Sequence, residues 1–196
     1  MRSHQPSAVS RQGTAVGRQP SAVRHRSRLT GALIAALGIV TAALPAAAAA
    51  QEEPIGLARG TVVRPLSVAD LDGQAVDLGQ VIGRRPVLVE FWATWCGNCA
   101  ALEPRMRAAY QRHGSQVEFL VVAVGVNQTP ASVKRRLAQH TLPGHRVLWD
   151  GNGAAVRAFE APATSYVILL DRQGKVAYTG IGPDQDLEAA LARVGH

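Results

Sequence analysis

The stretch that decides the fold is Pro86-Val-Leu-Val-Glu-Phe-Trp-Ala-Thr-Trp-Cys-Gly-Asn-Cys99. Its first half, residues 86–92, is nearly continuous in apolar residues, which is typical of a strand at the centre of a covered sheet. A helical pattern begins at Cys96 and runs to about His113, with apolar residues available for one buried face. The only two cysteines of the chain therefore lie where a buried strand gives way to a helix.

The spacing of the two cysteines predicts redox chemistry. Cys96 falls at the N-terminus of the expected helix, where unpaired backbone N–H groups and the helix dipole stabilise a thiolate. Cys99 follows about one helical turn later, so the two sulfurs can meet within disulfide geometry. One thiol can then attack the disulfide of a partner, and the other can resolve the mixed disulfide.

Two other roles are open to a Cys-x-x-Cys pair. Half of a metal site would need further cysteine or histidine ligands, and no histidine of residues 51–196 is closely spaced with the pair. A structural disulfide would close so short a loop that it adds little stability. The sequence therefore favours a redox-active pair. The histidines in question are His113, His140, His145 and His196.

Glu90 is an acid inside the apolar strand. A lone buried charge is costly, and burial raises the pKa of a carboxyl group. A carboxyl group with a raised pKa is suited to exchange a proton with a thiol such as that of Cys99. The alternative is that Glu90 is an exposed acid at the edge of a strand.

The charge of the chain is concentrated in its first fifty residues. Apolar residues make up 47% of the sequence and charged residues 18%, which is a globular composition. The formal net charge is +7, but residues 1–50 hold six arginines and no acid, so residues 51–196 are nearly neutral. Bulk charge therefore gives no reason to expect a nucleic-acid partner.

Residues 1–50 are predicted to be a signal peptide or a membrane anchor. The apolar run Leu29–Val40 has the length of a signal-peptide core, and Ala46–Ala50 offers sites for a signal peptidase. As an uncleaved anchor, Leu29–Ala50 carries no charge and is long enough to span a bilayer. Both interpretations export residues 51–196, to the periplasm or to the extracytoplasmic face of a membrane, where disulfide chemistry is normal.

Residues 51–61 are expected to be a lead-in segment, and residues 62–196 a single domain in which strands and helices alternate. Such alternation predicts a mixed sheet covered by helices on both faces. Asp72-Gly73 is a strong hairpin dipeptide, and Thr129 followed by Pro130 is a typical helix start. The expected elements are a hairpin over 66–78, strands at 86–92, 117–126, 146–150, 166–171 and 175–179, and helices at 96–113, 130–140, 153–159 and 184–194.

The segment Phe91-Trp-Ala-Thr-Trp-Cys-Gly-Asn-Cys99 resembles the active-site segment of the thioredoxin fold. With its leader and hairpin, the chain is similar to exported thioredoxin-like proteins of the TlpA/ResA type, over roughly Val62–Val194. The resemblance implies an α/β thioredoxin-like fold, with a central mixed β-sheet flanked by helices on both faces and an N-terminal β-hairpin. It further implies that Cys96 attacks, that Cys99 resolves, and that the two form a redox-active disulfide with no metal and no other cofactor.

Other residues match the family one by one. Trp95 matches an aromatic residue that covers the active site, and Glu90 matches a buried acid beneath the disulfide. Pro104 matches a proline that kinks the helix. The dipeptide Gly97-Asn98 departs from thioredoxin, which commonly has a proline there, so the redox potential of thioredoxin is not carried over.

The family places a cis-proline opposite the disulfide, and Pro162 is interpreted as this residue. Because Pro162 lies farther from Asp171 than the family spacing, a longer or bulged strand would have to follow it. If Pro162 is instead an ordinary trans proline, Ser165 would face the cysteines and substrates would dock differently. The residues expected to dock the substrate are Trp95, Gly97, Asn98, Ala161 and Pro162.

The expected function is the reduction of protein disulfides outside the cytoplasm. The resemblance implies protein thiol and disulfide substrates, a membrane electron donor, and roles in cytochrome c maturation or in the assembly of copper sites; a monomer is expected. A disulfide-forming oxidant would use the same residues at a different potential. The alternatives are a copper-delivery protein using Cys96, Cys99 and a histidine, and a thiol peroxidase in which Thr94 activates Cys96.

Overall fold

The computed structural model of the chain describes residues 55–144 and 146–194. The predicted leader, residues 1–50, lies outside this range. Within the described residues, no helix has the length and apolar character needed to cross a membrane. In chain order the elements are β1 (Ser67–Asp70), β2 (Ala75–Asp77), the 3-10 helix η1 (Leu78–Gln80), β3 (Val87–Trp92), α1 (Gly97–His113), β4 (Glu118–Val124), α2 (Pro130–Gln139), β5 (Arg146–Asp150), α3 (Ala154–Ala158), β6 (Tyr166–Leu170), β7 (Val176–Gly180) and α4 (Leu187–Leu191).

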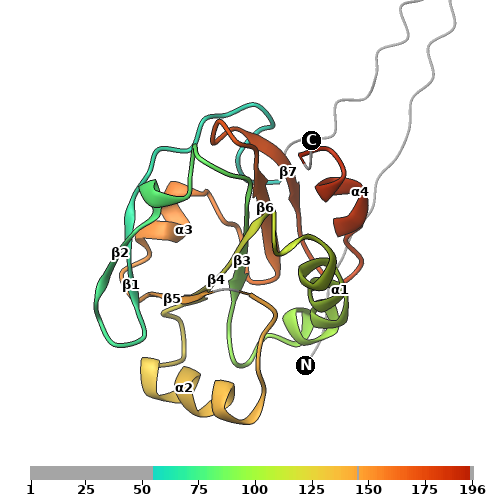
Figure 1. The fold of residues 1–196 in the computed structure, drawn as a ribbon. Helices are drawn as coiled ribbons and strands as arrows, with labels where there is room; N and C mark the ends of the chain where they lie inside the picture. Colours follow the sequence, from blue (N-terminus) through green and yellow to red (C-terminus); the bar gives the residue numbers. More distant parts are fainter. Residues whose placement is uncertain (1–54, 145, 195–196) are drawn as a thin grey trace, which may run out of the picture. The chain divides into compact units, whose positions relative to one another are not determined.

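The sheet is built around the two longest apolar runs, which form β3 and β4 at its centre (Figure 1). These strands pair in parallel, with Glu90 opposite Val121. β3 also pairs with the antiparallel β6, so it has a neighbour on each side and all its residues are buried. The strand order is β2-β1-β5-β4-β3-β6-β7, in which the N-terminal hairpin extends one edge through antiparallel pairing of β1 with β5.

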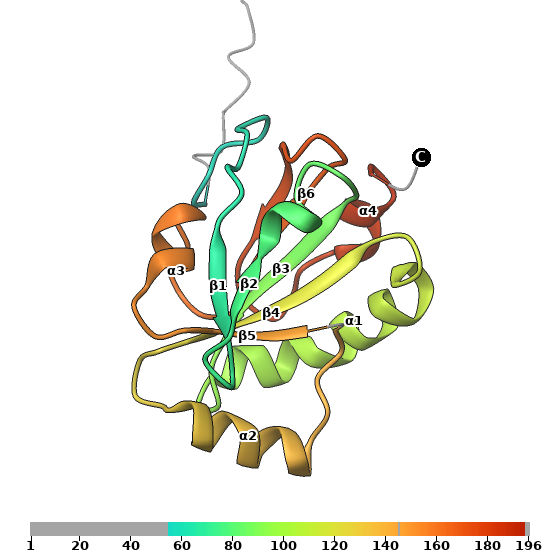
Figure 2. The ribbon, with the colours of Figure 1, turned by 60° about the vertical axis from the view of Figure 1, so that its left-hand side comes forward.

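Helices cover both faces of the sheet, as the alternation of elements predicted. Successive residues of a strand point to opposite faces. Leu88 of β3 packs in one hydrophobic cluster with residues of α1 and α4, whereas Val89 packs in another cluster, which includes Ala155 of α3. Figures 1 and 2 show α1 and α4 together on one side of the sheet and α3 on the other. The chain therefore has the predicted mixed α/β sheet with two covered faces.

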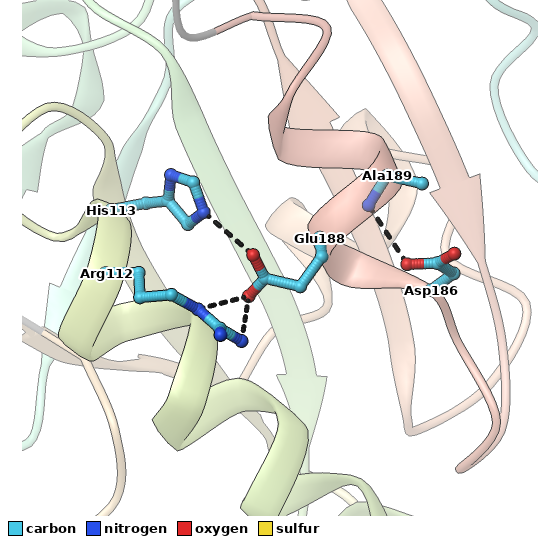
Figure 3. A network of polar contacts seen from close by, with 5 residues as sticks. All are labelled: Arg112, His113, Asp186, Glu188 and Ala189. Carbon is cyan, nitrogen blue, oxygen red and sulfur yellow. Dashed lines mark hydrogen bonds and ion pairs between the residues drawn. The ribbon is translucent and has the colours of Figure 1, made fainter.

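Glu188 of α4 links this helix to α1 through polar contacts with two residues of α1 (Figure 3). Arg112 donates to Glu188 Oε1 through Nε (3.1 Å) and Nη2 (2.8 Å), and His113 Nε2 lies 3.0 Å from Oε2. Burial alone would raise the pKa of Glu188, but the hydrogen bonds and charges of His113 and Arg112 outweigh it and lower that pKa. Asp186 caps the same short helix by accepting from Ala189 N–H (3.0 Å).

Most element boundaries agree with the sequence prediction, and the start of α4 differs. The predicted cap Thr129 begins α2 with a full capping box, in which Thr129 and Ser132 satisfy each other's backbone N–H groups. The predicted last helix began at Asp184, whereas α4 begins after Asp186. Asp184 instead pairs with Arg105 of α1 (3.1 Å), and Asp186 supplies the cap. Asp184 and Asp186 are equally suitable caps by residue type, so the sequence alone does not show which of them begins the helix. The contact of Asp184 with Arg105 distinguishes the two.

Asp150 is a structural acid whose loss should destabilise the fold. It is buried at the end of β5, and its Oδ1 and Oδ2 accept from Ala155 N–H (3.2 Å) and Val156 N–H (2.8 Å) at the start of α3. Asp150→Ala leaves both amides without this acceptor and is expected to lower the free energy of unfolding by about 2 kcal/mol. Urea unfolding measures the change. Asp184→Ala, which removes an exposed ion pair, serves as the control and should cost less than about 0.5 kcal/mol; equal losses would contradict the assignment.

Candidate active site

The two cysteines form a disulfide at the N-terminus of α1. Their Sγ atoms are 2.08 Å apart and their Cα atoms 5.3 Å apart. Cys96 is the N-cap residue of the helix, and its Sγ accepts a hydrogen bond from the backbone N–H of Cys99 (3.0 Å). When the disulfide opens, the same N–H and the helix dipole would stabilise a Cys96 thiolate. The pairing predicted from the spacing is therefore present in the structure.

Glu90 is buried beneath α1. It is 3% exposed, and its Oε1 has no hydrogen-bond partner among the described residues. Strand alternation places its side chain on the face of Leu88, which α1 covers, so the carboxyl group lies under the helix that carries Cys99. Burial, reinforced by the charge of Glu103, raises the pKa of Glu90 to about 8. The alternative of an exposed acid at a strand edge is wrong, because β3 is paired on both sides.

A loop after β4 holds the active-site loop in place. Gln128 accepts from Thr94 N–H through Oε1 (2.8 Å) and donates to the Val124 carbonyl through Nε2 (2.6 Å). Trp95 Nε1 donates to the carbonyl of Val126 (2.8 Å), and both of these side chains are about half exposed. Val126 and Gln128 were not predicted from the sequence. The parallel arrangement of β3 and β4 could have indicated them, since loops that follow parallel strands meet at one edge of the sheet.

The structure overturns the interpretation of Pro162 as a cis-proline. No cis peptide bond occurs among the described residues, and Pro162 is an exposed trans proline in the loop before β6. The predicted longer strand after it is also absent, because β6 begins only at Tyr166. Ser165 takes the position next to the disulfide instead. Its backbone N–H donates to the Phe91 carbonyl (2.8 Å), and Cys99 Sγ lies 3.9 Å from the same oxygen.

The other residues expected to dock substrate differ in how far they are exposed. Gly97 and Asn98 are exposed in the first turn of α1, between the cysteines. Ala161 is half-buried and is held in its loop by a hydrogen bond from its N–H to the Val156 carbonyl (2.9 Å). Across the described part of the chain, no three His, Cys, Asp or Glu side chains gather closely enough to hold a metal ion.

The fold and this site together define a thioredoxin-like protein with a redox-active dithiol. Residues 40–193 match the Redoxin family, and the chain belongs to that family. It is 28% identical over 130 residues to the thiol-disulfide oxidoreductase ResA of Bacillus cereus, which covers 65% of this chain and 73% of that protein. The chain is therefore a thiol–disulfide oxidoreductase.

Solved structures confirm the fold. A putative thiol:disulfide interchange protein DsbE from Chlorobium tepidum superposes with a TM-score of 0.61 at 23% identity, covering 71% of this chain and 99% of that one. A secreted Mycobacterium tuberculosis disulfide oxidoreductase homologous to E. coli DsbE gives a TM-score of 0.56 at 18% identity, over 65% of this chain and 95% of that one.

The buried Glu90 should make stability depend on pH. Above the ordinary glutamate value of 4.5 the unfolded chain releases the Glu90 proton, whereas the folded chain holds it until about pH 8. The folded state then binds more protons than the unfolded state, so the free energy of unfolding falls as the pH rises from 4.5 to about 8. The slope approaches about 1.4 kcal/mol per pH unit.

Glu90→Gln cannot ionise and is expected to remove this fall, as measured by urea unfolding of the oxidised protein across the same pH range. Asp77→Asn is the control, because hydrogen bonds from Gln80 and Gly79 lower the pKa of Asp77, so its contribution is lost only below the ordinary value of 3.8. An unchanged slope in Glu90→Gln would show that the wild-type Glu90 is ionised in the folded protein throughout this range.

Proposed function

We propose that this protein works outside the cytoplasm as a reductant of protein disulfides. The observation that carries the proposal is the buried carboxyl group of Glu90 beneath a disulfide at a helix N-terminus. The acid-free, arginine-rich leader and its apolar run support export. The similarity to ResA, a thiol-disulfide oxidoreductase, supports the direction, because the TlpA/ResA resemblance implies a reducing role.

The reaction follows from the geometry of the pair. The Cys96 thiolate, held at the N-terminus of α1, attacks one sulfur of a partner disulfide, forms a mixed disulfide and releases the first partner thiolate. Glu90, which is protonated in most molecules at neutral pH, first releases its proton to solvent; its carboxylate then takes the Cys99 proton, and the Cys99 thiolate attacks Cys96 Sγ. The second partner thiolate leaves and takes a proton from water, so two electrons have passed to the partner and the Cys96–Cys99 bond is restored.

Glu90 suits the resolving step because its pKa lies close to that of a thiol. An acid of ordinary pKa would hold a thiol proton poorly, whereas a carboxyl group that titrates near pH 8 can accept and return it at small cost. The buried position also keeps Cys99 away from bulk solvent, since Cys99 is 1% exposed. Proton transfer within the site therefore replaces direct exchange with water.

The exposed surface around the disulfide fits an uncharged segment of a protein substrate. Trp95, Gly97 and Asn98 are exposed beside Cys96, and Pro162 is exposed on the neighbouring loop. None of these side chains carries a charge, so apolar contacts and backbone hydrogen bonds would supply the binding. A membrane electron donor would reduce the pair again, and cytochrome c maturation or the assembly of copper sites are the pathways that the resemblance implies.

Cysteine variants test the order of attack. Cys99→Ser is expected to accumulate a mixed disulfide with disulfide-containing substrates, because the Cys96 thiolate can attack and nothing resolves the product. Cys96→Ser should lose turnover entirely, since the remaining thiol is buried. Non-reducing electrophoresis after incubation with a disulfide-containing protein such as insulin measures the trapped species. Trapping by Cys96→Ser, and none by Cys99→Ser, would reverse the assigned roles.

The redox potential of the pair decides between reductant and oxidant. Trp95 adjoins Cys96, so its fluorescence can follow the equilibrium of the full chain with a glutathione or dithiothreitol series. We expect a value near or below about −270 mV, that of thioredoxin, and a value near about −120 mV, that of DsbA, would overturn the reducing direction. A pair without a reversible two-electron transition, but with tight one-to-one binding of Cu(I), would replace the proposal with copper delivery.

A further inference from the structure

An open groove of about 440 Å³ lies between α1 and α2 (Figure 2), a volume within the range of small-molecule sites. Part of its lining is apolar and consists of Ala100, Pro104 and Ala108, which follow one another at four-residue spacing along α1. Residues with this spacing share one face of a helix, so the three form an apolar stripe, which extends for about 12 Å. The stripe is long enough to cover the body of a small molecule.

Charged side chains line the rest of the groove. Arg107 comes from α1, Arg136 from α2, and His140 from the C-terminal end of α2. Among the described residues, Glu103 is the one acid of this lining, and both of its oxygens are occupied. Arg107 Nη2 donates to Oε1 (2.6 Å), and His140 Nε2 lies 2.6 Å from Oε2. Two arginines therefore face one acid, and the groove has an excess of positive charge.

Arg136 is the charged group of the groove that lacks a partner. Its Nε is buried and has no hydrogen-bond partner among the described residues. A buried donor of a charged group that stays unpaired costs about 1–3 kcal/mol or more, and such groups in folded proteins usually have a water or an ion as partner. Because Glu103 is already bound on both oxygens, the acceptor for Arg136 has to come from solution.

We propose that this groove binds a small monocarboxylate, whose carboxylate group contacts Arg136 and Arg107 and whose short aliphatic body lies along the apolar stripe. The planar guanidinium group matches the geometry of a carboxylate, and charge-assisted hydrogen bonds of this kind are strong. A bare ion such as phosphate would leave the stripe uncovered, and Glu103 disfavours a ligand of higher negative charge. The proposal is independent of the proposed reductase activity, since it assigns no step of that reaction to these residues.

Hexanoate is the probe that tests this site, with acetate and inorganic phosphate as anions that lack the aliphatic body. In two-dimensional amide NMR spectra of the oxidised full chain, we expect hexanoate to shift the signals of residues 100–111 and 136–140 and to saturate with a Kd of about 1 mM. Acetate and phosphate should bind at least about ten-fold more weakly, because they bury no CH₂ groups against the apolar stripe.

Arg136→Gln is expected to weaken hexanoate binding about ten-fold, which corresponds to the loss of one hydrogen bond to a charged group. Because the Nε of Arg136 has no partner among the described residues, this variant should stay folded. Arg135→Gln is the matched control, since it removes the same charge from the neighbouring, exposed position of α2, which does not line the groove. Its Kd for hexanoate should equal that of the wild-type chain.

Three outcomes would overturn the assignment. Hexanoate that leaves the signals of residues 100–111 and 136–140 unchanged shows that the groove does not bind it. Equal weakening in Arg136→Gln and Arg135→Gln shows attraction by the overall charge of α2 instead of a site. Equal affinities for hexanoate, acetate and phosphate show that the apolar stripe takes no part in binding.

Discussion

The parallel pairing of β3 with β4 is the constraint on which the site depends. It brings the ends of both strands to one edge of the sheet, where the loop of Thr94 and Trp95 meets the loop of Val126 and Gln128. The same strand end starts α1, so Cys96 enters the helix with its sulfur already facing a backbone N–H. Parallel pairing requires burial on both faces, and the continuous apolar sequence of β3 supplies it.

That burial raises the pKa of the Glu90 carboxyl group and lowers the stability of the fold. A strand that is buried on both faces has no solvated position for an acid. Burial therefore raises the pKa of Glu90, and its carboxyl group stays mostly protonated and uncharged at neutral pH. An apolar residue would stabilise the fold more at this position, because Oε1 finds no partner among the described residues. The retention of an acid where the fold disfavours it is the reason to assign it a chemical role.

The sequence predicted the parts of the site that depend on local pattern and left out those that depend on loops. The strand, the helix cap and the Cys96–Cys99 disulfide follow from a short continuous stretch, and each was confirmed. Gln128 could not be assigned in this way, because its bond to Thr94 joins residues far apart in sequence. Pro162 was misassigned because proline was taken as the signal, whereas the position itself is set by where β6 begins.

At position 165, before β6, a serine makes hydrogen bonds that a proline could not make. A proline has no N–H, so it could not donate to the Phe91 carbonyl, and it has no hydroxyl to receive Gly182 N–H. Serine does both, and it thereby joins the end of β3, the loop before β6 and the loop after β7 into one polar unit. The strain of its positive φ is offset by these bonds, and the shared Phe91 carbonyl brings that unit to within contact of Cys99. The loops before β6 and after β7 are therefore held by side-chain and backbone hydrogen bonds rather than by the stiffness of a proline ring.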